Sequence, residues 1–174
     1  YVRDTDYCSA AALMVDKSLW DTVGGFDERF APCYYEDTDL CFAIRRQGKR
    51  VLYQPAAKVL HLEGVSHGTD VSEGVKAYQA RNQRTFAQKW RRTLNSHAPN
   101  GERPLREVNR CARVRILWLE ACVITPDQDS GSLRTLRLLR LLLRLGCKVT
   151  FAADNLLADE PYGSQLRDEG IEVL

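Results

Sequence analysis

The 174-residue sequence lacks several features that identify whole classes of protein. It has no apolar run near the roughly 20 residues that cross a bilayer, and no internal repeat or low-complexity tract. Its 25 basic and 23 acidic residues nearly balance, so net charge gives no reason to expect a nucleic-acid partner. Its six cysteines include no CxxC pair and no zinc-type cluster with histidine, which favours reduced thiols in a cytoplasmic protein.

The residues that are present suit a globular α/β protein. Hydrophobic residues make up 44% of the chain and support a buried core, and 28% charged residues is ordinary for a soluble protein. The length suits one large domain or two small ones. Strand-like segments lie close to Tyr1 and Leu174, so we expect the chain to be part of a longer polypeptide.

The first third of the chain alternates short strand and helix patterns. The apolar run 8–15 has the length of a buried strand. Asp16 is a candidate N-cap for a short helix over 17–23. A further helix is expected to be capped by Asp37 or Thr38. After it, the segments RVLYQ and AKVLHLE have the composition of two short strands.

From residue 71 to about 95 the pattern becomes helical. Apolar residues recur at spacings of three, four or eight and form one stripe, which comprises Val71, Val75, Tyr78, Phe86, Trp90 and Leu94. The polar stretch 96–112 holds two prolines and a glycine and has no period, so we predict a linker there.

A second unit begins near residue 113. Two strand runs, 114–120 and 147–154, flank a leucine-rich helix, and a short helix and the start of a third strand follow. This alternation predicts right-handed crossovers and a parallel sheet, which together form an incomplete Rossmann-like βαβαβ unit.

Three acidic residues, Glu36, Asp37 and Asp39, directly follow Tyr34 and Tyr35. Unpaired amides and the helix dipole stabilise carboxylates at a helix N-terminus, so simple capping explains one or two of these acids. Capping explains the flanking tyrosines less well. A carboxylate beside aromatic rings and another acid tends toward a raised pKa, as a general base requires. The pattern alone leaves both interpretations open.

Other residues suggest ligand sites more weakly. His61 and Glu63 alternate on a predicted strand and could face one metal ion, although a histidine at a strand end is usually only hydrogen-bonded. Gly131 and Ser132 lie near the start of the leucine-rich helix, where phosphate binds well, but without GxGxxG spacing. Arginines on that helix could touch a membrane surface, although a helix that covers a parallel sheet explains them more simply.

The motifs from about residue 6 to residue 66, taken together, resemble the C-terminal half of an inverting family 2 glycosyltransferase with the GT-A fold. The family order is a Cys-Ser strand, then GGFDE, then E-D-x-D-L, then a strand that ends in histidine. This chain reads CSAAALMV, GGFDERF, EDTDL and AKVLHLE. The segment YQARNQRTFAQKW also resembles the one that follows this half in bacterial polysaccharide enzymes.

The resemblance implies a role for each residue of the candidate site. Asp37 matches the base that deprotonates the acceptor hydroxyl. Glu36 and Asp39 would orient the acceptor, and a tyrosine such as Tyr35 would stack on a sugar ring. His61 matches a candidate ligand of the divalent metal, Mn²⁺ or Mg²⁺, that binds the diphosphate of the donor.

The implied substrates are a nucleotide-sugar donor and a hydroxyl of a glycan or lipid-linked saccharide, in cell-surface polysaccharide biosynthesis. We expect a cytoplasmic enzyme, and peripheral contact with the inner face of the cell membrane stays open. The sequence departs from the family at Ala10, where a glycine is common. The family's metal-binding Asp-x-Asp lies in the upstream half, so we expect no activity from this chain alone.

Residues 113–174 resemble, less specifically, the start of a GT-B-type glycosyltransferase. The expected domains are therefore a partial GT-A domain with a trailing helix at 1–95, a linker at 96–112 and part of a GT-B-like Rossmann domain at 113–174. Two other functions stay open. One is a non-catalytic sugar- or nucleotide-binding module in which Asp37 is only a cap, and the other is a basic interaction module acting through helix 71–95.

Overall fold

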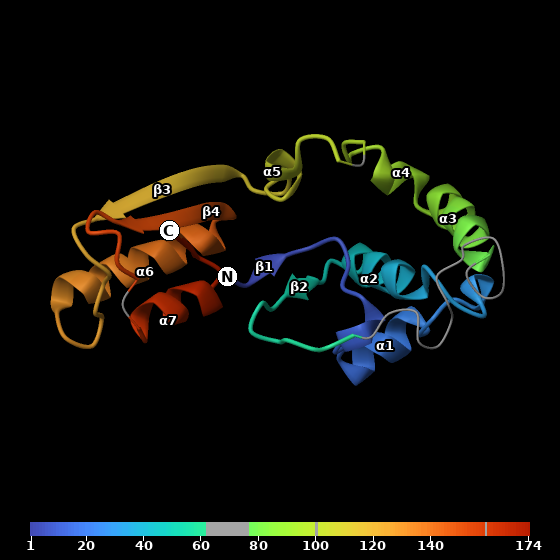
Figure 1. Ribbon diagram of the computed structural model, residues 1–174, viewed down its shortest axis with the longest axis horizontal. Coiled ribbons are helices and arrows are strands. Elements are labelled where there is room, and N and C mark those ends of the chain that lie inside the picture. Colours follow the sequence, from blue (N-terminus) through green and yellow to red (C-terminus); the bar gives the residue numbers. More distant parts are fainter. Residues whose placement is uncertain (62–76, 100, 159) are drawn as a thin grey trace. The chain divides into compact units, whose positions relative to one another are not determined.

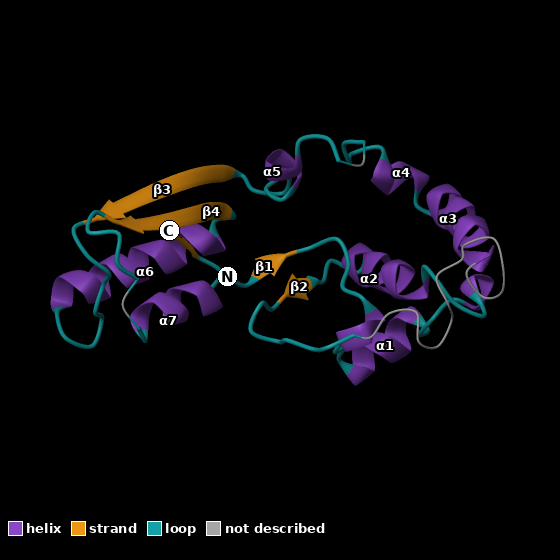
Figure 2. Ribbon diagram, in the orientation of Figure 1, coloured by secondary structure: helices purple, strands orange, loops and turns teal. Residues whose placement is uncertain are grey.

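The computed structural model of the protein describes residues 1–61, 77–99, 101–158 and 160–174 (Figure 1). Its contacts divide the chain into two compact units, Asp4–Glu102 and Tyr1–Arg3 with Arg103–Leu174. Helices and strands are mixed along the chain (Figure 2). None of the described helices is long and apolar enough to cross a membrane.

The unit that contains the C-terminus is built on a parallel sheet. The chain forms strand, helix, strand, helix and strand in turn: β3 Val114–Glu120, α6 Ser130–Arg144, β4 Cys147–Ala153, α7 Tyr162–Asp168 and β5 Glu172–Val173. The strands pair in the order β3–β4–β5, and both pairs are parallel. The prediction of an α/β unit with a parallel sheet is therefore confirmed.

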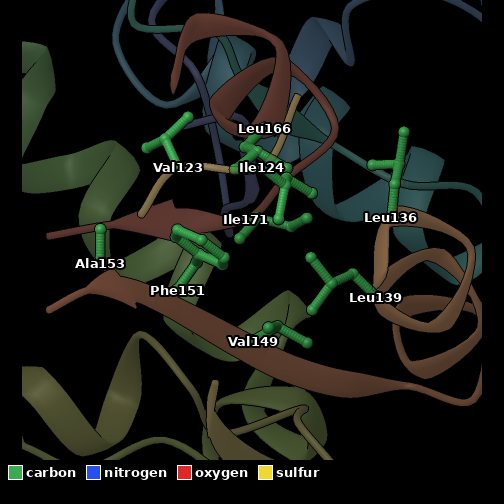
Figure 3. Close-up of a cluster of buried hydrophobic side chains, with 9 residues drawn as sticks. All are labelled: Val123, Ile124, Leu136, Leu139, Val149, Phe151, Ala153, Leu166 and Ile171. Carbon is green, nitrogen blue, oxygen red and sulfur yellow. The ribbon is translucent and has the colours of Figure 1, made fainter. Parts of the chain in front are cut away.

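Nine buried hydrophobic side chains join this sheet to its two helices (Figure 3). On β4, Val149, Phe151 and Ala153 are buried while the residues between them are partly exposed, which is the period of two of a strand with one packed face. Leu139 from α6 and Leu166 from α7 belong to the same cluster. Burial of each large side chain contributes about 1.5–3 kcal/mol, so this layer holds both helices on the sheet.

The apolar run 114–120 has the composition of a buried strand, but β3 is only partly buried in the described structure. Leu117 is 59% exposed and Leu119 is 69% exposed, whereas Trp118 packs against the hydrophobic cluster. β3 is an edge strand of the described sheet, and described residues cover only one of its faces. An apolar run in a sequence does not distinguish a strand with two covered faces from a strand with one.

The other unit is mainly helical. Its elements are η1 Ala10–Ala12, α1 Lys17–Val23, η2 Glu28–Phe30, α2 Glu36–Arg46, α3 Ala77–Lys89 and α4 Arg91–Leu94, and β1 Arg3–Asp4 pairs with β2 Leu52–Tyr53. The helix predicted over 17–23 is confirmed. The Asp16 carboxylate accepts a hydrogen bond from Leu19 N at 3.0 Å, and Gly24 ends the helix with φ of +87°.

Two strand predictions in this unit are wrong. The run 8–15 forms no strand and contains the short 3₁₀ helix η1, because three successive alanines favour a strand poorly and the Ser9 side chain accepts a hydrogen bond from Ala11 N. In the segment 57–63, residues 57–61 form no strand, and the last two residues lie outside the described part. Val59 and Leu60 are 60% and 88% exposed, so no packed face holds them in a strand.

The helix predicted over 71–95 is present where the structure describes it, as α3 and α4. Residues 71–76 lie outside the described part of the chain, and the two helices are separated at Trp90. The stripe buries Phe86 and Trp90 against Phe30 and Phe42. Within the predicted linker 96–112, residues Pro104–Glu107 form a further short helix, α5.

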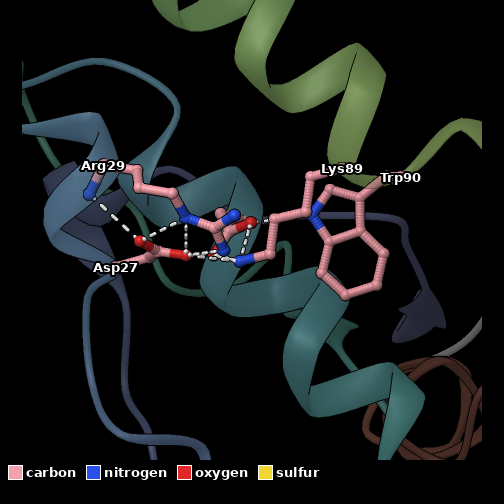
Figure 4. Close-up of polar contacts among 5 residues, drawn as sticks. Asp27, Arg29, Lys89 and Trp90 are labelled. Carbon is pink, nitrogen blue, oxygen red and sulfur yellow. Dashed lines mark hydrogen bonds and ion pairs between the residues drawn. The ribbon is translucent and has the colours of Figure 1, made fainter.

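A buried carboxylate connects α2 to the end of α3. Asp39 is 2% exposed, and its carboxylate accepts a hydrogen bond from Trp90 Nε1 at 2.7 Å and lies 2.7 Å from Lys89 Nζ. Lys89 also contacts Asp27 at 2.7 Å, and Asp27 in turn binds Arg29 (Figure 4). Hydrogen bonds from Arg29, and then from Lys89, hold the pKa of Asp27 well below its usual range.

We expect Asp39→Asn to destabilise this unit by about 3 kcal/mol, because removing one partner of a buried ion pair leaves an incompletely compensated charge. Lys89 keeps its contact with Asp27, which places the loss at the low end of the usual range. Urea unfolding followed by tryptophan fluorescence would measure the change. Asp21→Asn is the matched control, because its ion pair with Lys17 is exposed and should contribute less than about 1 kcal/mol. Equal losses in the two variants would contradict the buried-pair account.

Candidate functional site

The acidic residues lie in the first turn of α2, but neither proposed cap is the cap. α2 begins at Glu36 and its N-cap is Tyr35, which lies two residues before Asp37 and three before Thr38. Tyr35 O accepts the first helical hydrogen bond, from Asp39 N at 2.8 Å, and the Tyr35 side chain makes no cap bond. Asp37 and Thr38 are therefore inside the helix. Simple N-capping does not explain Asp37.

The Asp37 carboxylate is fixed by backbone amides on both of its oxygens. Oδ2 accepts a hydrogen bond from Ala10 N at 3.0 Å, and Oδ1 accepts one from Thr38 N at 2.6 Å. The Ala10 bond connects the start of α2 to η1. Because each carboxylate oxygen has two lone pairs, Asp37 can hold this orientation and still accept a proton from a ligand.

Glu36 lies beside Asp37 in a different environment. It is partly buried, and its Oε2 atom is buried without a hydrogen-bond partner among the described residues. Burial raises the pKa of Glu36, and the charge of Asp37 raises it further. The two neighbouring acids therefore have unlike surroundings: the oxygens of Asp37 are hydrogen-bonded to amides, whereas Glu36 has a buried oxygen without a partner among the described residues.

The two tyrosines before the acids have a backbone conformation that L-amino acids rarely adopt. Tyr34 has φ of +71° and Tyr35 has φ of +74°. Each such residue costs on the order of 1–3 kcal/mol and persists only where its surroundings hold it. The Tyr35 ring packs against Phe86, with 5.4 Å between ring centroids, and burial raises the pKa of Tyr35. The ring predicted to stack on a sugar therefore already has one aromatic neighbour.

Asn82 on α3 holds the loop that carries these tyrosines. It is fully buried, and its Nδ2 atom lies within hydrogen-bond distance of three carbonyl oxygens, those of Phe30 at 2.8 Å, Cys33 at 2.8 Å and Tyr34 at 3.0 Å. Arg81 donates to Asn82 Oδ1 at 3.0 Å. One side chain thus fixes the path of the chain into the acidic turn.

Our sequence analysis missed Asn82, although a signal was present. Tyr78, Asn82, Phe86, Trp90 and Leu94 follow one another at spacings of four, so Asn82 is a polar residue in the apolar stripe. A polar side chain on a packed helix face must find hydrogen-bond partners inside the protein. Its presence there predicts a buried contact of the kind that the structure shows.

Asp39 is placed apart from the other two acids. It is buried, and both Lys89 and Trp90 bind its carboxylate. This location suits a residue that holds α2 in place. It is less suited to a residue that contacts a ligand. The acidic turn therefore presents Glu36 and Asp37, with Asp39 beneath them.

The described residues do not assemble a metal site. His61 is exposed, Glu63 lies outside the described part, and no three His, Cys, Asp or Glu side chains converge within that part of the chain. Asp4 and Asp6 form an Asp-x-Asp pair, the pattern of a metal-diphosphate motif, but both are engaged in ion pairs with arginines. Asp4 binds Arg50 at 2.8 Å, and Asp6 binds Arg45 at 2.6 Å.

The phosphate contact predicted at Gly131 and Ser132 already faces a carboxylate. Asp129 is the N-cap of α6, and its Oδ1 accepts a hydrogen bond from Ser132 N at 2.7 Å. Hydrogen bonds, those from Ser132 first, lower the pKa of Asp129. A phosphate at these amides would have to displace that anion. Glu120 also lines the adjoining cavity, whose volume is about 450 Å³, and adds a second carboxylate beside these amides.

Comparison with known proteins identifies a sugar-transferring relative for part of the chain. Over 76 residues it is 37% identical to the N-acetylglucosaminyl-diphospho-decaprenol L-rhamnosyltransferase of Mycobacterium tuberculosis, in strains CDC 1551 / Oshkosh and ATCC 25618 / H37Rv. It is also 28% identical over 83 residues to the uncharacterized protein y4gI of Sinorhizobium fredii, which is 48% of this chain and 9% of that protein. No protein-family model and no solved structure matches the chain. The match covers 44% of this chain and 24% of the rhamnosyltransferase, so the chain is similar to a glycosyltransferase over less than half of its length.

Proposed function

We propose that the chain is part of an inverting glycosyltransferase, which transfers a sugar from a nucleotide-sugar donor to a hydroxyl of a glycan or lipid-linked saccharide. The observation that carries the proposal is the acidic turn, in which Asp37 is fixed by Ala10 N and Thr38 N beside a Glu36 of raised pKa. The partial similarity to a rhamnosyltransferase that acts on a lipid-linked saccharide supports it. A lipid-linked acceptor would bring the enzyme to the inner face of the cell membrane.

We assign the acidic turn to the acceptor side of a GT-A-type site. Asp37 takes the proton of the acceptor hydroxyl while that oxygen attacks the anomeric carbon of the donor sugar and inverts it. Glu36 orients the same hydroxyl. Asp39 positions the helix, and the exposed part of Tyr35 borders the sugar. The C-terminal unit, with its three parallel strands, is assigned to a second, GT-B-type module.

A divalent cation, Mn²⁺ or Mg²⁺, would neutralise the diphosphate of the donor. His61 is the one ligand that we assign to it within the described residues, since these residues contain no group of three or more His, Cys, Asp or Glu side chains that could hold a metal ion. The cation would therefore be held mainly by groups elsewhere in the enzyme and by the donor itself.

Asn82→Ala should lower turnover while leaving donor affinity nearly unchanged, because the loop carbonyls that position Glu36 and Asp37 lose their donor. The loss of a buried hydrogen-bond partner should also destabilise the unit by about 1–3 kcal/mol. Exchange of the backbone amide hydrogens at residues 33–37 should accelerate by more than the loss of global stability accounts for. Gln83→Ala, at the exposed neighbouring position, is the control. Unchanged exchange at 33–37 in a folded Asn82→Ala protein would refute the positioning role.

Asp37→Asn should lower turnover of the full-length enzyme by roughly 100-fold or more, the scale of general-base assistance. Asparagine keeps the size and one oxygen acceptor, so folding should survive with a loss of about 1 kcal/mol. Donor binding, measured by calorimetry with a panel of nucleotide sugars, should barely change. Asp21→Asn, on exposed α1, is the matched control. Near-normal turnover by folded Asp37→Asn enzyme would rule out the base assignment.

His61→Ala should raise the manganese concentration that gives half-maximal activity, since one ligand is lost. The expected shift is about tenfold, at the lower end of what losing groups around a bound metal produces. Leu60→Ala, at the adjacent exposed position, controls for changes in the loop. If both variants give the wild-type titration, His61 is not a ligand.

A further inference from the structure

Basic side chains converge on a cleft at the opposite end of α2 from the acidic turn. The cleft has a volume of about 890 Å³ and lies between the last turn of α2 with the residues just after it, the end of α3, and α4. Phe42 and Trp90, both buried, form part of its lining. Arg45 lies eight residues beyond Asp37, a distance of about 12 Å along a helix, so the arginines of the cleft are separate from Asp37, although Lys89 and Trp90 in the lining also reach Asp39.

The cleft is lined by charge of a single sign. Six of its described lining residues are basic and none is acidic: Arg45, Arg46, Lys49, Lys89, Arg91 and Arg92. Arg45 is paired with Asp6, and Lys89 is paired with Asp27 and Asp39. The ion pairs between described residues do not include the other four cations, which are Arg46, Lys49, Arg91 and Arg92.

Helix ends account for only part of this charge. α2 ends at Arg46 and α3 ends at Lys89, so both C-termini lie at the cleft. The C-terminus of a helix carries about half a negative charge, and two of them offset about one positive charge. Four cations form no ion pair between described residues, and one of them, Lys49, acts electrostatically on Asp16, so about two positive charges remain. A concave surface lined by one sign of charge concentrates its field on a counter-ion.

We propose that this cleft binds a phosphate-bearing anion. Arginine presents its donors in a planar fork that matches phosphate oxygens, and Arg46, Arg91 and Arg92 are all exposed. Thr93 and Gln88 add a hydroxyl and an amide to the lining. The volume lies in the range of small-molecule sites and suits a phosphate or diphosphate group with room for what it is attached to. This site does not depend on the transferase activity proposed above.

The test compares two double variants that remove the same charge. Arg91→Gln with Arg92→Gln lies in the cleft, and Lys58→Gln with Arg84→Gln lies at exposed positions outside it. Binding of inorganic pyrophosphate is measured by calorimetry. Binding to phosphatidylcholine vesicles, with and without phosphatidylglycerol, is measured by co-sedimentation. Circular dichroism establishes that each variant is folded.

The cleft variant should bind about tenfold more weakly or worse, the scale of losing charge-assisted hydrogen bonds, and the control should stay within about twofold of wild type. If the loss appears with pyrophosphate, the ligand is a soluble phosphate compound. If it appears only with vesicles that contain phosphatidylglycerol, the ligand is a lipid headgroup. Both results support the site. The proposal is overturned if wild type binds neither probe, or if the control loses as much binding as the cleft variant.

Discussion

The Asp39 carboxylate is the contact on which the helical unit depends. Lys89 and Trp90 reach it from the end of α3, and Asp39 itself belongs to the first turn of α2. A buried charge is tolerated only when it is paired and hydrogen-bonded, so this contact fixes which turn of α3 faces which turn of α2. The aromatic cluster around Phe86 and Phe42 then packs in that register. A hydrophobic contact alone would allow sliding, whereas a hydrogen-bonded carboxylate has directional partners.

The same helix pairing lets α3 control the chain that enters the acidic turn. Asn82 lies two turns before Trp90 on the same face, where it meets the carbonyl groups of Phe30, Cys33 and Tyr34. These contacts offset the cost of the two positive-φ tyrosines. The result is a turn in which Glu36 and Asp37 have little freedom before any ligand binds. Orientation that is fixed in advance is what a general base needs, since its proton transfer depends on a narrow range of distance and angle.

The sequence predicts the elements whose signals are local and periodic. The helix over 17–23 is marked by an N-cap aspartate and by a glycine at its end, and α3 by apolar residues at spacings of four. The second unit alternates strand and helix patterns, which implies a parallel sheet. The strand predicted over 8–15 fails because a run of small apolar residues says nothing about a partner strand. The burial of Asp39 could not be predicted, because it depends on Lys89 and Trp90, fifty and fifty-one residues away. The candidate site residues were named from a resemblance, and the contacts that orient them required the structure.

The charges on α2 follow from helix electrostatics and differ in sign between its two ends. Acidic residues at its N-terminus and basic residues at its C-terminus both oppose the helix dipole, so each group is stabilised where it stands. At the acidic end, the backbone amides of Ala10 and Thr38 take up the carboxylate of Asp37 and leave it ordered. At the basic end, Arg46 joins Lys49 and the α4 residues Arg91 and Arg92 in the lining of the cleft, and none of these four forms an ion pair between described residues. The helix dipoles are too weak to offset their charge. At the acidic end both oxygens of Asp37 are hydrogen-bonded within the protein, whereas the basic end has a surplus of charge that a bound anion would neutralise.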